Sequence, residues 1–389
     1  FVWDVGSGKM LAGPLRHPNK VNWFEFSPGG EHLISACRDG GARIWDLRSG
    51  RLARLPLRHQ EGLHSAHFSQ DGRRIVTASE DDTARIWDMD SGRELAKPLP
   101  HQSSVTWAEF SLAGRKIATA SADLTARVWD ATSGEPLTPP LRHESSVARA
   151  HFSPDGRWLL TTSQDTAGIW NAATGQSAGQ RLAHRGPVLF AGFSSDGSRV
   201  LTASADGMAR VWDAHTGGPL TEPLKHGAPL RVAHFSPDST RVVTMSEEPI
   251  TRIWDTASGH LLFEPLLHQG TVGDAPDARF APDGGRLATV TPDGVLRLWD
   301  VPVVPVPTPA WFSELAETVA GKRFDAQGRS IPVSASRLVH LRQQLISDSS
   351  TNFYARWAKW FFADRSTRAA SPFPPLSAAN VGRRENSEK

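Results

Sequence analysis

Residues 84–88 read Ala-Arg-Ile-Trp-Asp, and the same pattern returns 42 positions later as Ala-Arg-Val-Trp-Asp at residues 126–130. Eight of the fourteen tryptophans follow this spacing, at intervals of 42, 42, 42, 41, 42, 42 and 45 residues: Trp3, Trp45, Trp87, Trp129, Trp170, Trp212, Trp254 and Trp299. An aspartate follows each of them except Trp170, which precedes Asn171. A fixed period of this length identifies an array of structural repeats.

Within one repeat, three runs rich in β-branched and aromatic residues are separated by turn residues. In the repeat that ends at Trp129, these runs are Val105–Phe110, Lys116–Ser121 and Thr125–Trp129. A turn is expected at Thr132-Ser133-Gly134, followed by a short fourth strand at Pro136-Leu137, where proline suits an edge that lacks a hydrogen-bonding neighbour. Each repeat is therefore predicted to form a four-stranded antiparallel sheet.

The period, the Trp-Asp ending and a histidine in the turn before the first strand resemble the WD-repeat family over residues 1–301. A lone four-stranded sheet cannot bury both faces, so copies stack around an axis into a ring. The resemblance therefore implies an all-β fold, a β-propeller of four-stranded antiparallel blades. Seven inner-strand triplets predict seven blades, and an eighth blade is the alternative. We expect the strand near Lys9–Pro14 to pair beside the last blade, which ends at Asp300, and so to close the ring.

Histidine, a hydroxyl residue and an acid recur with the tryptophan in successive repeats. Two of these sets are His59, Thr77, Asp81 and Trp87, and His101, Thr119, Asp123 and Trp129. A catalytic triad needs one such set in one pocket, whereas a copy in each repeat indicates a structural role. By resemblance to the family, each set forms a buried hydrogen-bonded tetrad that pairs the carboxylate. Asp165 is shifted by one position and Glu248 replaces the aspartate, so the repeats ending at Trp170 and Trp254 are expected to be the least regular.

Composition excludes several classes of function. A formal charge of +2 is too small to predict a nucleic-acid platform, and a single cysteine, Cys37, excludes an internal disulfide and fits a cytoplasmic protein. No catalytic or metal-binding motif is present, so we expect neither an enzyme nor a cofactor. An enzyme in the central channel would need a unique cluster of polar residues facing that channel, and the repeats show none.

The part of the chain after the repeats has a different composition. Four prolines in Val301–Pro309 predict a boundary, with a proline-rich linker at 302–310 between the propeller and a helical extension at 311–370, and a disordered tail at 371–389. Helical spacing is found in Trp311–Ala320, Ser336–Ile346 and Asn352–Ala363. The aromatic helix near 357 is expected to pack on protein rather than on a membrane. The run Ala-Arg-Trp-Ala-Lys-Trp-Phe at 355–361 is similar to the ends of large bacterial WD-repeat proteins, some with an upstream kinase, so a longer multi-domain chain is expected.

Positions five and six residues after each histidine vary while their neighbours repeat, which is typical of binding positions. The candidates for partner binding are Trp23, Trp107, Arg149, Phe190 and Arg231. We expect them to be surface anchors on the face that carries the histidine and acid turns; the alternative is that the aromatic members fill space between blades. The predicted function is a non-catalytic scaffold or sensor for protein or peptide partners. The alternative is the regulatory module of a larger signalling enzyme, such as a protein kinase, whose catalytic domain precedes residue 1.

Overall fold

The structure is a computed structural model that describes residues 1–4, 9–248, 250–262, 264–268, 277–291, 295–301, 310–320, 322–324, 330–347 and 353–363. The proline-rich linker expected at 302–310, apart from its last residue, and the tail expected at 371–389 lie outside the described residues. Contacts divide the chain into two compact units, one built mainly on Phe1–Phe280 and the other mainly on the residues that follow Arg297.

The first unit consists of antiparallel sheets whose strands follow one another in sequence order. The first sheet contains β3 (Val21–Phe26), β4 (His32–Cys37), β5 (Gly41–Asp46) and β6 (Arg51–Leu52), with β7 (Leu57–Arg58) also paired to β5. Five four-stranded sheets follow: β8 (Leu63–Phe68), β9 (Arg74–Ser79), β10 (Thr83–Asp88) and β11 (Leu99–Pro100); β12 (Val105–Phe110), β13 (Lys116–Ser121), β14 (Thr125–Asp130) and β15 (Leu141–Arg142); β16 (Val147–Phe152), β17 (Trp158–Ser163), β18 (Thr166–Asn171) and β19 (Leu182–Ala183); β20 (Val188–Phe193), β21 (Arg199–Ser204), β22 (Met208–Asp213) and β23 (Leu224–Lys225); β24 (Leu230–Phe235), β25 (Arg241–Ser246), β26 (Ile250–Asp255) and β27 (Leu266–Leu267).

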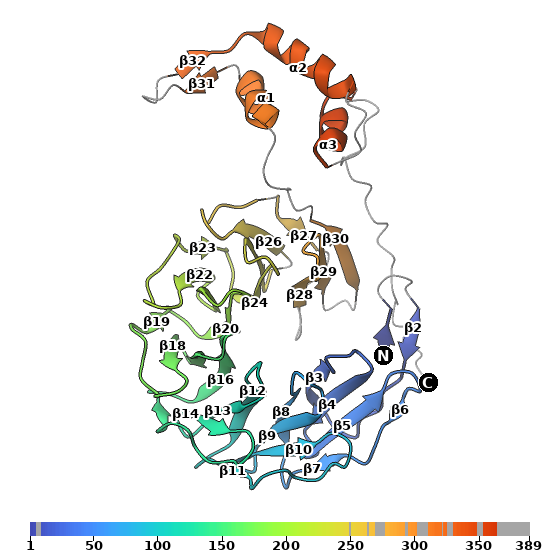
Figure 1. Cartoon of the computed structure of the whole chain (residues 1–389), viewed down its shortest axis with the longest axis vertical. Helices are drawn as coiled ribbons and strands as arrows, with labels where there is room; N and C mark the ends of the chain where they lie inside the picture. The colour runs from blue at the N-terminus through green and yellow to red at the C-terminus, as the bar shows by residue number, and fades with distance from the viewer. Residues whose placement is uncertain are drawn as a thin grey trace. The chain divides into compact units, whose positions relative to one another are not determined.

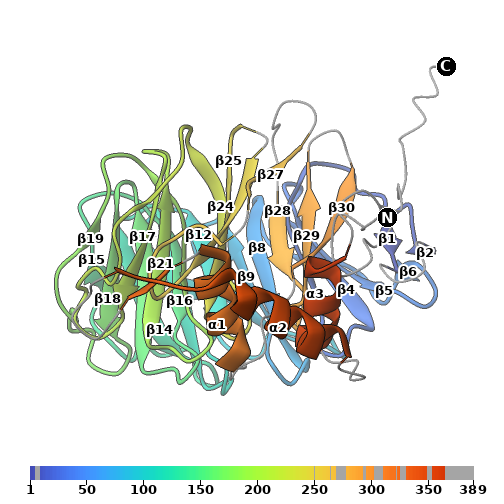
Figure 2. The same ribbon diagram turned by 90° about the horizontal axis from the view of Figure 1, so that it is seen from above.

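These sheets are arranged as in a β-propeller. Figure 1 shows β8, β12, β16, β20 and β24 innermost in their sheets, and Figure 2 shows the same sheets from the side, with their strands upright. The three strands expected before each tryptophan are confirmed, for example by β12, β13 and β14. The fold is therefore all-β in this unit, with the inner strand of each sheet facing the centre.

The outermost strand of each sheet lies farther along the chain than expected. Pro136 makes only an isolated bridge to Trp129, and the fourth strand is Leu141–Arg142, which pairs with Thr125 and Ala126. The same isolated bridge forms in other repeats at Glu94, Ser177 and Leu261, so it does not depend on proline. The fourth strand expected at Pro136-Leu137 is therefore misplaced, since the observed strand, Leu141–Arg142, lies farther along the chain.

The hydrophobic core lies between neighbouring sheets. One cluster joins Val76 and Ile86 of the second sheet to Val105, Ile117 and Trp129 of the third. The middle strands are buried along almost their whole length, because both faces of each sheet are covered by a neighbour. At roughly 1.5–3 kcal/mol for each large apolar side chain buried, this stacking of sheets stabilises the array more than any one sheet could alone.

The first strands do not close a ring in the expected way. β1 (Val2–Trp3) and β2 (Met10–Ala12) pair with each other in a two-stranded sheet. A separate three-stranded sheet has the order β28 (Asp277–Phe280), β29 (Arg286–Val290) and β30 (Leu296–Asp300). The expectation that the Lys9–Pro14 strand pairs beside the last blade is therefore wrong, since Val2 and Trp3 take its hydrogen bonds instead.

The second unit contains the three expected helices and a short hairpin that was not expected. The helices are α1 (Ala310–Ala320), α2 (Ala335–Ser347) and α3 (Phe353–Phe361), and the hairpin pairs β31 (Lys322–Phe324) with β32 (Ser330–Pro332). Within this unit Trp311 meets Tyr354 edge to face, and Trp357 stacks on Phe361 at 5.1 Å between ring centres. None of the described helices combines the length and the apolar character needed to span a bilayer.

Candidate partner-binding cavity

The repeated polar residues form hydrogen-bonded networks at one end of the sheets. In the repeat ending at Trp129, the His101 Nδ1 donates to Asp123 Oδ2 at 2.9 Å, its Nε2 lies 2.7 Å from Thr119 Oγ1, and Trp129 Nε1 donates to the same hydroxyl at 2.8 Å. The repeat containing His59 repeats this geometry at 2.9, 2.7 and 2.8 Å. A third complete network surrounds His184.

Burial and hydrogen bonding act in opposite directions on the carboxylate of such a network. Burial disfavours the charged form of Asp123, but hydrogen bonds from the Gln102 N–H, the Thr125 hydroxyl and His101 outweigh it and lower its pKa to about 2. Burial lowers the pKa of His101, so the ring is neutral at neutral pH and donates through Nδ1. The structure thus brings His, Thr, Asp and Trp together in the two sets quoted from the sequence.

Other repeats hold only part of this network. The Nε2 of His143, in the repeat ending at Trp170, is buried and has no hydrogen-bond partner among the described residues; the same holds for the Nδ1 of His226, in the repeat ending at Trp254. These are the two repeats in which the sequence departs from the pattern. The first repeat was not expected to be irregular, yet its Asp39 pairs with Arg43 at 2.5 Å instead of with a histidine.

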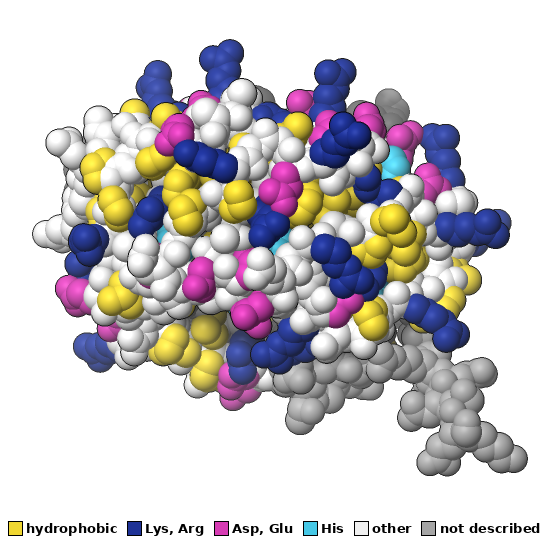
Figure 3. Space-filling view, turned by 90° about the horizontal axis from the view of Figure 1, so that it is seen from below, with side chains coloured by type: hydrophobic (Ala, Val, Ile, Leu, Met, Phe, Trp, Pro, Cys, Tyr) yellow, Lys and Arg dark blue, Asp and Glu magenta, His cyan; other side chains and the backbone are white. Residues whose placement is uncertain are grey.

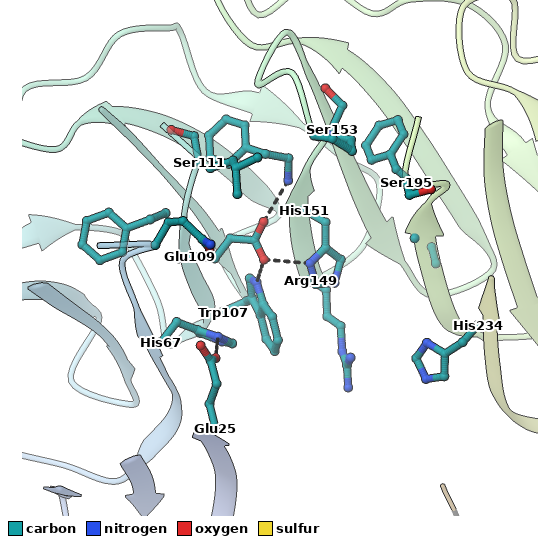
Figure 4. Close-up of a pocket in the computed structure, with 18 of the residues that line it drawn as sticks. Glu25, His67, Trp107, Glu109, Ser111, Arg149, His151, Ser153, Ser195 and His234 are labelled. Carbon is teal, nitrogen blue, oxygen red and sulfur yellow. Dashed lines mark hydrogen bonds and ion pairs between the residues drawn. The ribbon is translucent and has the colours of Figure 1, made fainter. Parts of the chain in front are cut away.

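A cavity of about 580 Å³ lies among the inner strands of the first unit. Its walls come from β3, β8, β12, β16, β20 and β24, with Arg279 of β28, and Figure 4 shows its side chains. The turns that follow the inner strands, at Ser111-Leu112 and Ser153-Pro154, contribute to its lining. These turns lie at the opposite end of the inner strands from the histidine and acid turns, which the sequence analysis placed on the binding face.

Four of the five candidate binding residues line this cavity. They are Trp23, Trp107, Arg149 and Phe190. Each follows a β-bulge near the start of its inner strand, as between Val105 and Trp107, and a bulge redirects the side chains beside it. The fifth, Arg231, is not among the lining residues; it is exposed and pairs with Glu247 at 2.5 Å.

Trp107 is a wall of the cavity rather than a surface anchor, since only 4% of it is exposed and it packs in the core between sheets. Its ring meets that of Trp23 edge to face, with 4.9 Å between centres. The Arg149 guanidinium carbon lies 5.1 Å from the Trp107 ring centre and 5.8 Å from that of Trp23. The two alternatives from the sequence, binding a partner and filling space between blades, do not exclude each other, because these indoles both pack between sheets and line the cavity.

A cluster of acids and histidines in the cavity wall was missed by the sequence analysis. The His151 Nδ1 donates to Glu109 Oε2 at 2.8 Å, the Phe152 N–H donates to Glu109 Oε1 at 2.8 Å, and Trp107 Nε1 also donates to Oε2. Glu25 makes the corresponding bonds to His67 Nδ1, at 2.5 Å, and to the Phe68 N–H. We call these two pairs, Glu25–His67 and Glu109–His151, the inter-sheet braces, because each joins one inner strand to the next.

The braces contradict the expectation that no polar cluster faces the centre. Burial opposes the charge on Glu109, but the charge and hydrogen bond of His151 outweigh it and lower the pKa of the carboxyl. The sequence does contain a signal for these pairs, which is their spacing. Residues 25, 67, 109 and 151 are each 42 positions apart and occupy the fifth position of successive inner strands. They alternate between Glu and His.

The outer surface offers no comparable concentration of one charge on the face seen in Figure 3. Lys and Arg side chains there are interspersed with Asp and Glu, and hydrophobic side chains lie between them in small groups. The cavity, in contrast, combines a concave shape, aromatic walls and a partly buried cation, Arg149.

Comparison with known proteins agrees with the repeat pattern. The family model described as WD domain, G-beta repeat matches five times, at residues 11–46, 52–88, 93–130, 135–171 and 176–213. This chain belongs to the WD-repeat family. WD-repeat domains typically act as non-catalytic scaffolds in protein–protein interaction.

Among solved structures, this WD-repeat protein is similar to the computationally designed Ika8 protein, whose crystal structure superposes with a TM-score of 0.68 at 24% sequence identity. The match covers 77% of this chain and 89% of the designed one. At this identity the likeness concerns the fold alone. No curated protein matches the chain.

Proposed function

We propose that this WD-repeat protein is a non-catalytic scaffold or sensor that holds a protein or peptide partner in the cavity among its inner strands. We further propose that residues 1–301 form a seven-bladed propeller and that the helices of residues 311–370 are a separate extension. The observation that supports the binding function is the cavity itself, which places Trp23, Trp107, Arg149 and Phe190 around one concave space. Tryptophan and arginine are the residues that most often dominate binding energy at protein interfaces.

The chemistry of the cavity supports binding rather than catalysis. Both oxygens of Glu109 accept hydrogen bonds, from His151 and Trp107 on one side and from the Phe152 N–H on the other. The carboxylate thus joins two sheets, so its histidine partner supports the wall of the cavity.

The test is peptide binding by the full chain with variants inside and outside the cavity. A library of synthetic peptides is selected on immobilised protein, and the affinity of the best peptide is measured by fluorescence anisotropy. Replacing Phe190, a partly buried wall residue, with alanine should weaken binding by roughly tenfold or more, as for other interface anchors. The matched control is Arg231→Ala, which removes a long side chain outside the cavity and should change affinity by less than about twofold.

Thermal unfolding of both variants distinguishes a loss of binding from a loss of structure. If Phe190→Ala and Arg231→Ala bind the peptide equally well, the cavity is not the binding site and the proposal is wrong.

A further inference from the structure

Arg149 is placed in the cavity with its hydrogen-bonding capacity unused. Its guanidinium lies against the rings of Trp107 and Trp23, and no described residue accepts a hydrogen bond from it or forms an ion pair with it. Figure 4 shows the side chain extending away from the Glu109 carboxylate into the space between Trp107 and His234. A guanidinium carries five N–H donors in one plane, so this group has donors to offer to a bound molecule.

The acidic residues of the cavity do not meet this demand. Glu109 accepts hydrogen bonds from His151, Trp107 and a main-chain N–H, and Glu25 accepts them from His67 and another main-chain N–H, so both carboxylates are held by partners other than Arg149. Burial and the nearby charge of Arg279 disfavour the cation on Arg149 and lower its pKa, and the charge of Glu109 offsets this only in part. A partly buried cation under this penalty gains most from an anion that enters beside it.

The aromatic contacts also define which anion fits. Both indoles lie against the guanidinium carbon, and two parallel N–H donors of a guanidinium match the two oxygens of a carboxylate. The indoles hold the side chain in one position before binding, which reduces the entropy lost when the ion pair forms. On another side of the cavity, Phe190 packs edge to face on His234, with ring centres 4.5 Å apart. That apolar wall suits the methylene stem of the side chain that carries the carboxylate.

We propose that the cavity recognises an acidic side chain, aspartate or glutamate, of a partner peptide, and that Arg149 forms a bidentate ion pair with its carboxylate. The inference rests on the proposed function and names the partner's chemistry. A peptide is the occupant that fits, because Leu112, at the turn that lines the cavity, is 55% exposed and offers apolar contact to residues that flank the acidic one.

The experiment uses heptapeptides with acetylated and amidated ends, so that side chains are the only source of carboxylates. They are selected on the full chain, and the strongest binder is resynthesised with each Asp or Glu replaced by Asn or Gln. We expect selected peptides to be enriched in acidic residues. Removing the critical carboxylate should weaken binding by roughly tenfold or more, the effect typical of losing a charge-assisted hydrogen-bonded pair.

Protein variants then locate the carboxylate. Arg149→Gln should bind the acidic peptide more weakly by a similar factor, but it should bind the amide peptide with an affinity within about threefold of that of the unmodified protein. The two changes are not additive, because each removes the same ion pair between Arg149 and the peptide carboxylate. Arg149→Lys, which keeps the charge without the planar fork, should fall between them. Arg231→Gln is the matched control, an exposed arginine outside the cavity, and thermal unfolding is recorded for each variant.

The outcomes separate this inference from the proposed function. If binding is lost in Phe190→Ala but is insensitive to removal of peptide carboxylates, the cavity binds peptides and the acidic specificity is wrong. If the acidic peptide loses equal affinity on Arg149→Gln and Arg231→Gln, the assigned partner of the carboxylate is wrong. If no peptide binds, or if binding is unaffected by every cavity variant, both proposals fail.

Discussion

Replacing Asp123 with alanine tests whether the repeated polar networks stabilise the fold. The carboxylate accepts hydrogen bonds from His101 Nδ1, from the Gln102 N–H and from both the N–H and the hydroxyl of Thr125, at 2.6–3.0 Å. Its side chain is only 5% exposed. The fall of its pKa from 3.8 to about 2 corresponds to roughly 2 kcal/mol favouring the folded state at neutral pH. Because donors are also left unpaired, we expect a loss of about 2–3 kcal/mol in the free energy of unfolding.

The matched control is Asp165→Ala. Asp165 occupies the corresponding turn in the repeat ending at Trp170, but it is exposed and does not reach His143, so its loss should cost under about 0.5 kcal/mol. Both free energies come from guanidinium unfolding followed by tryptophan fluorescence. Equal losses in the two variants would refute the reasoning. A loss of peptide binding by folded Asp123→Ala would also contradict it, because this network lies at the opposite end of the inner strands from the turns that line the cavity.

Three further predictions concern stability. Trp129→Ala removes a side chain that is 2% exposed and should cost about 3–5 kcal/mol, so an unchanged denaturation midpoint would contradict it. Burial holds the pKa of His143 at about 4 and that of His226 at about 3, so the unfolded chain binds protons first as pH falls below 6.5. The free energy of unfolding, measured by urea titration, should therefore decrease from pH 6.5 to pH 4, and it should decrease less steeply in His226→Gln. Identical pH profiles for the two proteins would contradict this. Removing residues 311–389 should preserve the sheets, since the pairings of β3 to β27 lie within residues 21–267; loss of the β signal in circular dichroism would show otherwise.

Most of the sheet architecture was predictable because it depends on residues that recur within each repeat. The alternation in Lys116–Ser121 and Thr125–Trp129 and the recurrence of His101, Thr119 and Asp123 are local or strictly periodic, so one repeat is enough to infer the rest. The outer strand was misplaced because the residues just after each turn make only a single bridge, with or without proline, and the paired strand follows later in the chain. Asp39 pairs with Arg43 while His17 Nδ1 lies 3.0 Å from Leu15 O, a departure that the sequence does not mark, because Asp81 and Asp123 also have an arginine four residues later.

The cavity was harder to predict because its wall takes few residues from each repeat. In the sequence, Glu25, His67, Glu109 and His151 appear as isolated polar residues in otherwise similar strands, and only the arrangement of the inner strands makes them neighbours. The bulge before Trp107 has the same effect, since it changes where the side chain points without any local mark in the composition. The candidate residues were found through their variability, which does not reveal which face they serve.

The inter-sheet braces reveal a longer period within the array. Trp-x-Glu-Phe at residues 23–26 returns at 107–110, whereas the repeats after each of these carry His in place of Glu, in Ser-Ala-His-Phe at 65–68 and Arg-Ala-His-Phe at 149–152. With respect to the cavity, the unit of this part of the chain is therefore a doublet of 84 residues rather than a single repeat of 42. Duplicating one repeat would set two glutamates or two histidines side by side, whereas duplicating a doublet preserves every acid–base contact. Lengthening this propeller by design should accordingly proceed in steps of two blades.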